Sequence, residues 1–171
     1  TLYNGAIYTL KKNILLAVPM KGITKFSVYS GCIGIQGGAF SQCEATDVSL
    51  PNGLLAIDDF AFCEAKVENI NLPTSLLMIG EQAFAGTNLK SVVIPPHITY
   101  IDNAAFAQCK QLTTLTIPSS ASYMAIRAFW GCTSLQSITC TGTKAPTLEE
   151  AYDYDEKQFY NVPSSCTLAV P

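Results

Sequence analysis

The segment that organises this chain is Ile101-Asp-Asn-Ala-Ala-Phe-Ala-Gln-Cys-Lys-Gln-Leu-Thr-Thr-Leu-Thr-Ile-Pro118. Its Ala-Phe pair recurs along the sequence at an almost constant period of about 22 residues. The five pairs are Ala39-Phe40, Ala61-Phe62, Ala83-Phe84, Ala105-Phe106 and Ala128-Phe129. A fixed period of this size predicts a solenoid, in which each repeat is one supersecondary unit that buries its apolar side chains against its neighbours.

A second apolar pattern gives the same register. Each repeat has a short segment with apolar residues at its first, fourth and sixth positions, which in residues 89–95 and 112–118 ends in proline. Positions four and six alternate as in a strand with one buried face, and proline cannot donate the next hydrogen bond of a sheet. Between this proline and the Ala-Phe pair we expect a second short extended segment and a turn. The fourth-position residues, which predict six coils, are Phe26, Val48, Ile70, Val92, Leu115 and Ile138.

Both ends of the chain depart from the period, as the caps of a solenoid do. Two apolar runs flank the polar stretch 11–13, which predicts an N-terminal hairpin. The step from Ile138 to Leu168 is longer than any earlier one, so the last coil is longer, and Phe159 and Leu168 restore its anchors. We therefore expect a single domain over residues 1–171, with an N-terminal cap hairpin (1–22), regular repeats (23–140) and a divergent C-terminal coil (141–171).

Composition excludes several classes of protein. Charged residues make up 13% of the 171 residues and apolar residues 49%, which is typical of a packed domain and not of a disordered chain. A formal net charge of -3 argues against nucleic-acid binding. No apolar run approaches the roughly 20 residues of a membrane span. The sequence begins at Thr1 without a signal-like segment, so we interpret it as a mature or excised fragment.

No group of residues predicts catalysis or metal binding. The seven cysteines include no C-x-x-C pair, and Cys43, Cys109 and Cys132 each follow a repeat phenylalanine by three residues. Such a recurring place predicts buried thiols better than disulfides or metal ligands. The acidic stretch 149–156 lacks the spacing of a calcium loop, and the one histidine, His97, has no catalytic partners in the sequence. We expect no enzyme, no cofactor and no metal.

The outward positions of the expected strands form one candidate binding surface. They carry small polar side chains, which are suited to a flat hydrogen-bonding surface for a protein or a glycan. The same residues also suit an ordinary solvated strand, so both interpretations stay open. The candidates are Asp47, Asn69, Asn71, Ser91, Thr114, Thr116, Ser137 and Thr139.

Aromatic residues form a second candidate surface. Tyr100 and Tyr123 occupy equivalent places in adjacent coils, and Trp130 follows its repeat phenylalanine by one residue. Exposed aromatic side chains can anchor a partner protein or stack on a sugar. The alternative is that they pack against the longer C-terminal coil or against a neighbouring subunit.

The pattern I-x-x-x-A-F-x-x-C-x-x-L-x-x-L-x-I-P, which residues 101–118 match throughout, resembles the repeat of the BspA-type leucine-rich repeat family. The resemblance covers essentially the whole chain, although Thr87 replaces the cysteine in one repeat and Cys63 is displaced in another. It implies a strand-rich solenoid of the α/β type, a right-handed leucine-rich repeat coil with a parallel sheet on one face, exported to a bacterial surface. Family members with assigned roles bind host proteins or other cells, and the family has no shared catalytic motif.

These expectations combine into one leading hypothesis, a non-enzymatic cell-surface or secreted interaction module for adhesion or for binding a host or matrix protein. A first alternative is a glycan-binding module of a polysaccharide-uptake system, which would use Tyr100, Tyr123 and Trp130. A second is a passive spacer in a longer surface protein. The expected partner is a protein or cell-surface ligand, with a glycan as the other option and nucleic acid excluded.

Overall fold

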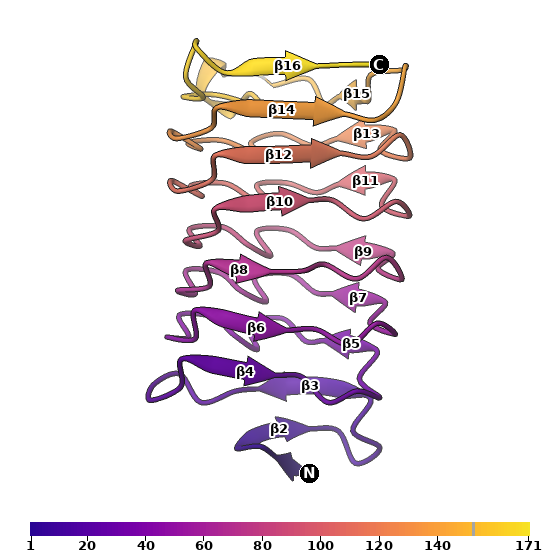
Figure 1. Cartoon of the computed structure of the whole chain (residues 1–171), viewed down its shortest axis with the longest axis vertical. Coiled ribbons are helices and arrows are strands. Elements are labelled where there is room, and N and C mark those ends of the chain that lie inside the picture. Colours follow the sequence, from indigo (N-terminus) through magenta and orange to yellow (C-terminus); the bar gives the residue numbers. More distant parts are fainter. Residues whose placement is uncertain (152) are drawn as a thin grey trace.

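Short strands and turns build the whole stack of coils, with the N-terminus at one end and the C-terminus at the other (Figure 1). The structure is a computed structural model that describes residues 1–151 and 153–171. Within these residues the one helical element is a 3₁₀ turn at Tyr154–Glu156. The α/β label is therefore wrong, and the fold is a β-solenoid of about six turns. The physical reason is length, because two strands and their corners use up the whole of such a short repeat and leave no room for a helix.

Two rows of strands lie on opposite sides of the stack (Figure 1). We call the first row the polar face. It contains β4 (Lys25–Ser27), β6 (Asp47–Ser49), β8 (Asn69–Ile70), β10 (Ser91–Val93), β12 (Thr114–Ile117), β14 (Ser137–Cys140) and β16 (Thr167–Ala169). We call the second row the tyrosine face. It contains β3 (Ile14–Ala17), β5 (Gly34–Ile35), β7 (Ala56–Ile57), β9 (Met78–Ile79), β11 (Tyr100–Ile101), β13 (Tyr123–Met124) and β15 (Thr147–Leu148).

Neighbouring strands within each row are parallel and in register from coil to coil. On the polar face Leu115 lies opposite both Val92 and Ile138, and Ile138 lies opposite Leu168, as the repeat frame predicts. On the tyrosine face Ile35, Ile57 and Ile79 are aligned in the same way. The expectation of a parallel sheet on one face is thus incomplete. The second extended segment of each repeat also pairs with its neighbours, because it has the same constant spacing.

The Ala-Phe pairs line the interior at a third side of each coil, which we call the Ala-Phe turn. Their rings stack nearly parallel from Phe40 to Phe159, with centroids 4.5 to 5.5 Å apart. Both members of each pair are buried, and Phe159 extends the stack into the last coil as the sequence predicts. Burying one such ring stabilises the fold by roughly 2 to 3 kcal/mol.

Each Ala-Phe turn is bracketed by two residues in the left-handed region of backbone space, one before the alanine and one two residues after the phenylalanine. In the coil of Phe62 these are Phe60 (φ 58°) and Glu64 (φ 58°). The bends point alternate amides at the next coil, so the Phe62 and Glu64 N–H groups donate to the Ala83 and Ala85 carbonyls, both at 2.7 Å. A third hydrogen-bonded ladder therefore runs along the stack beside the two rows of strands.

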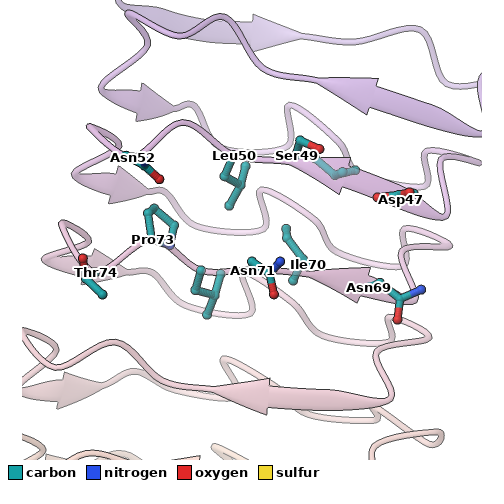
Figure 2. A pocket seen from close by; sticks show the side chains of 11 residues that line it. Asp47, Ser49, Leu50, Asn52, Asn69, Ile70, Asn71, Pro73 and Thr74 are labelled. Atoms are coloured by element: carbon teal, nitrogen blue, oxygen red, sulfur yellow. The ribbon is translucent and has the colours of Figure 1, made fainter.

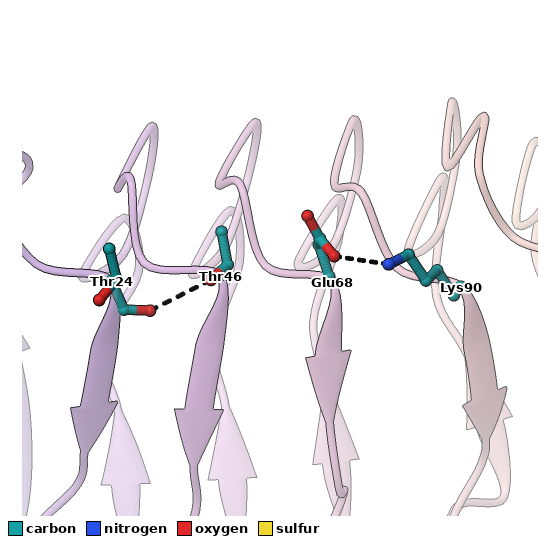
Figure 3. A network of polar contacts seen from close by, with 4 residues as sticks. All are labelled: Thr24, Thr46, Glu68 and Lys90. Atoms are coloured by element: carbon teal, nitrogen blue, oxygen red, sulfur yellow. Dashed lines mark hydrogen bonds and ion pairs between the residues drawn. The ribbon is translucent and has the colours of Figure 1, made fainter.

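Both strand rows are interrupted at the same level, between the third and fourth coils. The strands β8 and β10 are not paired, and neither are β9 and β11. The Ala-Phe turns continue through this level, where the Phe84 N–H donates to the Ala105 carbonyl at 2.8 Å and the two rings stay stacked. On the polar face one backbone hydrogen bond crosses this level, from the Lys90 N–H to the Glu68 carbonyl at 3.3 Å, and an ion pair of 2.6 Å joins the same two residues (Figure 3). The Ala-Phe turns are thus the lateral connection that spans all the repeats.

An antiparallel hairpin of β2 (Ala6–Tyr8) and β3 lies at the N-terminal end, with β1 (Leu2–Tyr3) on its outer edge. It buries Ala6 and Tyr8 but leaves Leu2 and Ile7 exposed, so its outer side is not the polar surface expected of a cap.

At the C-terminal end, Leu168 is 64% exposed, whereas the equivalent Leu115 is buried. The last coil keeps the register without covering its end. Within it, Tyr152 lies outside the described residues.

The cysteines are all free, and Cys32, Cys43, Cys109 and Cys132 are buried, as the repeat position predicts. The structure adds a role that the sequence did not reveal. The Cys109 thiol donates to the Phe84 carbonyl at 3.2 Å, and the Cys132 thiol donates to the Phe106 carbonyl at 3.3 Å. In the coil that lacks this cysteine, the Thr87 hydroxyl donates to the Phe84 carbonyl of its own coil at 2.9 Å. The coil of Phe62 has a buried Ala65 at this place, so the position requires a small side chain but not a donor.

Truncation of one stacked ring tests the role of the phenylalanines. We expect Phe84→Ala to lower the free energy of unfolding by about 3 to 5 kcal/mol, because the regular layers on both sides cannot collapse into the cavity. Phe60→Ala is the matched control, since that ring is 43% exposed. Its cost should be about 1 kcal/mol or less. Chemical denaturation of the purified variants measures both, and equal losses would contradict the account.

A pair of glycine substitutions tests the left-handed bends. Gly38 has a φ of 72° with open space where a Cβ would lie, so Gly38→Ala introduces backbone strain without a clash. We expect it to cost about 1 to 2 kcal/mol in unfolding free energy. Gly53 also has open space but no positive φ, so Gly53→Ala should be neutral or slightly stabilising. A neutral Gly38→Ala in the same denaturation experiment would contradict the backbone strain expected at the left-handed bends.

Candidate functional site

The structure brings the predicted polar candidates together on the outer side of the polar face, but in two blocks. Asp47 lies beside Asn69 on β6 and β8. Beyond the interruption, the remaining strand residues lie side by side on β10, β12 and β14. These are Ser91, Thr114 and Ser137 in one line and Thr116 and Thr139 in another. Whether this surface binds a ligand stays a prediction.

A groove of about 430 Å³ opens on the first of these blocks (Figure 2). Its physical origin is the short β8, which leaves the ladder after Ile70, so that Asn71 and Leu72 diverge from the coil before them. Three of its polar lining residues, Ser49, Asn52 and Thr74, were not among the sequence candidates. Asn52 and Thr74 lie in the corner after the strand-ending prolines. The polar residues that line this polar groove are Asp47, Ser49, Asn52, Asn69, Asn71 and Thr74.

Tyr100 and Tyr123 are neighbours on the tyrosine face, as their equivalent positions predict. Their rings stack with centroids 5.2 Å apart and planes 5° from parallel. One face of each tyrosine ring is therefore covered by the other ring, so less ring surface remains for a sugar to stack on. The apolar side chains of Leu55, Leu77 and Met78 are also exposed at or beside this row. Met78 has the place equivalent to Tyr100 in the repeat, whereas the exposure of Leu55 and Leu77 could not be predicted, because an apolar residue in a repeat is usually assigned to the core.

Carboxylates line the tyrosine face along one edge. Burial raises the pKa of Asp102, and repulsion from Asp59, Glu81 and Glu149 raises it further, whereas a hydrogen bond from the Asn103 N–H lowers it. The pKa of Tyr100 is also raised, by burial and then by the charges of Asp102 and Glu149. These carboxylates therefore interact with one another and with the tyrosines, and they give this face a negative potential.

Trp130 does not join the tyrosines in one stripe. It packs against a small separate cluster of Ala85, Ala104 and Ala107 beside the Ala-Phe turns. A pocket of about 280 Å³ lies there, lined by Trp130 with Gln108 and other side chains. The Trp130 Nε1 atom is buried and has no hydrogen-bond partner in the described part of the chain. The ring thus packs on alanines of the preceding coils, a contact that neither interpretation from the sequence had included, and its part in binding stays a prediction.

The cysteines, the histidine and the acidic residues that the structure describes form no metal-binding cluster. No cluster of three or more His, Cys, Asp or Glu side chains in residues 1–151 and 153–171 is suited to hold a metal ion. Burial raises the pKa of the Cys32 and Cys43 thiols, which disfavours the reactive thiolate. Among the described residues there is no helix with the length and apolar character needed to cross a bilayer.

The sequence matches a known repeat family over most of its length. Residues 22–164 match the family described as the BspA type leucine rich repeat region, in six copies. No curated protein sequence matches the chain.

Several solved structures are similar. A leucine rich cell surface protein from Faecalibacterium prausnitzii A2-165 is 32% identical over 77% of this chain and 36% of its own, with a TM-score of 0.73. The pneumococcal vaccine antigen PcpA is 20% identical over 98% of this chain and 41% of its own, with a TM-score of 0.78. A T. pallidum leucine rich repeat protein is 21% identical over 96% of this chain and 91% of its own, with a TM-score of 0.74. The chain thus spans less than half the length of the first two proteins, and the last two show the fold alone.

The repulsion between Asp102 and the neighbouring carboxylates of the tyrosine face predicts how a substitution at Asp102 changes the stability of the fold. A carboxyl with a raised pKa binds its proton more readily in the folded state, so its ionised form destabilises the fold above the unfolded pKa of about 3.9. We expect Asp102→Asn to stabilise the protein at pH 7 by an amount on the order of 0.5 kcal/mol after solvent screening. The gain should vanish near pH 3, where both states are protonated.

Denaturation midpoints at the two pH values measure this effect. Asp47→Asn serves as the control, because that carboxylate lies 3.5 Å from the Lys25 ammonium and its removal should give no gain. An Asp102→Asn variant that is no more stable at pH 7, or whose gain persists at pH 3, would contradict the repulsion.

Proposed function

The chain belongs to the BspA-type leucine-rich repeat family, and from this premise we propose that it is a non-enzymatic interaction module on a bacterial surface. In this proposal it binds a protein of another cell or of the surrounding matrix. The similarity to a leucine rich cell surface protein supports the location. The whole protein's partners and anchoring belong to the same proposal, because the chain spans part of its longer relatives.

The observation that carries the proposal is the open outer side of both strand rows. Parallel sheets are usually covered on both faces, most often by helices. Here the inner side of each row packs on the phenylalanine stack, while outer residues such as Asn69, Ser91 and Thr114 are exposed. An open parallel sheet offers a flat, rigid surface with evenly spaced side chains, and such a surface suits contact with another protein.

We assign the main contact to the polar face and its polar groove. The groove contributes amide, hydroxyl and carboxylate groups, and the half-buried Leu50 and Leu72 add apolar surface between them. A polar rim around a small apolar centre is common in protein interfaces. The glycan alternative has less support from the tyrosines, because the stacked rings of Tyr100 and Tyr123 cover each other.

Cell binding tests this proposal. We expect the purified chain to bind human epithelial cells in flow cytometry and to lose binding when the cells are treated with protease but not with glycosidases. The double variant Asn71→Arg/Thr114→Arg places two bulky charges on exposed positions of the polar face. It should weaken binding by at least tenfold, which corresponds to about 1.4 kcal/mol.

The matched control is Gln111→Arg/Ser134→Arg, which adds the same charge at exposed positions between coils. It should bind within about twofold of the unchanged chain. Binding that survives protease but not glycosidase would support the glycan alternative, and absence of any binding to cells or matrix proteins would favour the spacer. Either result would overturn the proposal.

A further inference from the structure

The tyrosine face exposes apolar side chains that the fold does not need. Leu77 is 57% exposed, and Met78 and Tyr100 are both 45% exposed. All three lie outside the core that the phenylalanine stack organises. Met78 and Tyr100 occupy equivalent places in consecutive coils on either side of the interrupted level, and Leu77 directly precedes Met78, so the three are neighbours along the stack (the apolar row) rather than scattered single residues. Contiguous exposed apolar surface of this kind is typical of an interaction site.

A row of uncompensated carboxylates runs beside the apolar row. Within residues 1–151 and 153–171 the ion pairs are Lys25–Asp47, Lys90–Glu68 and Arg127–Glu156, and none of them involves this row. Burial raises the pKa of Asp102 and repulsion from the rest of the row raises it further, so this carboxylate in its ionised form reduces the stability of the fold instead of increasing it. The residues of the row are Asp59, Glu81, Asp102 and Glu149.

Main-chain hydrogen bonds hold several of these carboxylates in place. The Glu81 N–H donates to Asp59 Oδ1 at 2.9 Å, and the Ile126 N–H donates to Glu149 Oε2 at 2.9 Å. The Glu149 side chain thereby contacts the backbone of the preceding coil at Ile126, and that coil has no carboxylate of its own at the corresponding place. Carboxylates fixed in this way lose little side-chain entropy when they pair with a cation.

The geometry of the two rows defines what would fit them. The carboxylates follow the apolar residues by two or three positions along each coil, a separation of about 7 to 10 Å. The coils repeat at about 5 Å, so the row from Asp59 to Glu149 extends over about 19 Å, the length of roughly six extended residues. Successive side chains of an extended segment point to opposite sides. A segment that lies along the axis would thus direct alternate side chains to the two rows.

We propose that the tyrosine face binds an extended segment of a partner protein in which lysine or arginine alternates with apolar residues. The basic side chains pair with the carboxylate row, and the apolar side chains cover Leu77, Met78 and the edges of the stacked tyrosines. This site is separate from the polar face to which the proposed function assigns its main contact.

Two peptides of identical composition test the proposal. Fluorescein-labelled KLKLKL has the alternating pattern, and KKKLLL has the same residues in two blocks. We expect fluorescence anisotropy to show that KLKLKL binds the whole chain at least fivefold more tightly than KKKLLL, and that 0.5 M salt weakens this binding. Equal affinity of the two peptides, or no binding of KLKLKL below 1 mM, would overturn the proposal.

Matched variants locate the site. Glu81→Gln/Asp102→Asn removes two charges from the row and should weaken KLKLKL binding by about five- to tenfold. The control Glu44→Gln/Glu64→Gln removes two exposed charges outside the tyrosine face and should change it less than twofold. Leu77→Ser should weaken binding, whereas Val93→Ser, an exposed valine of the polar face, should not. If a variant and its control lose KLKLKL affinity equally, the attraction is non-specific and the proposal is wrong.

This experiment separates the two proposals. Cell binding that is lost with the polar-face variant but unaffected by Glu81→Gln/Asp102→Asn, combined with no preference for KLKLKL, would leave the proposed function intact and remove the second site. If the chain prefers KLKLKL but binds no cell, the second site stands and the proposed function is wrong.

Discussion

The hydrogen-bonded ladder at the Ala-Phe turns is the constraint on which the rest of the structure depends. Both strand rows stop and restart between the third and fourth coils, whereas the ladder and the stacked rings pass through that level. In a solenoid each coil contacts only its neighbours, so stability is a sum of such contacts and a weak boundary is felt locally. The Phe84–Phe106 stack and the amides around it bridge this boundary. The polar face adds one backbone hydrogen bond of 3.3 Å from Lys90 to Glu68 and a surface ion pair between the same residues, which contributes about 1 kcal/mol at most.

Periodic burial made much of this fold predictable from the sequence. The buried phenylalanines, the register of Leu115 with Ile138 and the return of the anchors at Phe159 and Leu168 follow from spacing alone, because each coil must place the same side chains against its neighbour. The equivalent positions of Tyr100 and Tyr123 could be predicted for the same reason. The helical part of the α/β label came from resemblance and not from any helical pattern in the residues, and it was wrong.

Features that depend on a single coil could not be predicted. The left-handed bends fall on Phe60 and Glu64 as well as on glycines such as Gly38, so residue type gives no signal for them. The polar groove exists because one strand is two residues long, and neither Asn52 nor Thr74 belongs to a strand pattern. Trp130 was grouped with the tyrosines by sequence proximity, but it follows a bend that turns it toward the alanines of the preceding coils.

The same constraint determines where function can lie. Phenylalanine and aliphatic side chains fill the interior, so recognition is left to the outer surfaces. The two strand faces differ in chemistry, because one carries small neutral polar groups and a groove, and the other carries apolar side chains beside carboxylates. Two rigid faces of different character on one narrow stack would allow the chain to bind two unlike surfaces at once.

Amide hydrogen exchange, measured residue by residue, tests whether the ladder at the Ala-Phe turns holds the stack together at the interrupted level. The Phe84 and Gly86 N–H groups donate to the Ala105 and Ala107 carbonyls across the interrupted level, both at 2.8 Å. The account predicts that they exchange as slowly as the Phe62 and Glu64 amides one coil earlier. The Thr99 amide, which makes no such bond in the part of the chain that the structure describes, should exchange faster than its equivalent Leu77. Phe84 and Gly86 amides that exchange more than tenfold faster than those of Phe62 and Glu64 would contradict it.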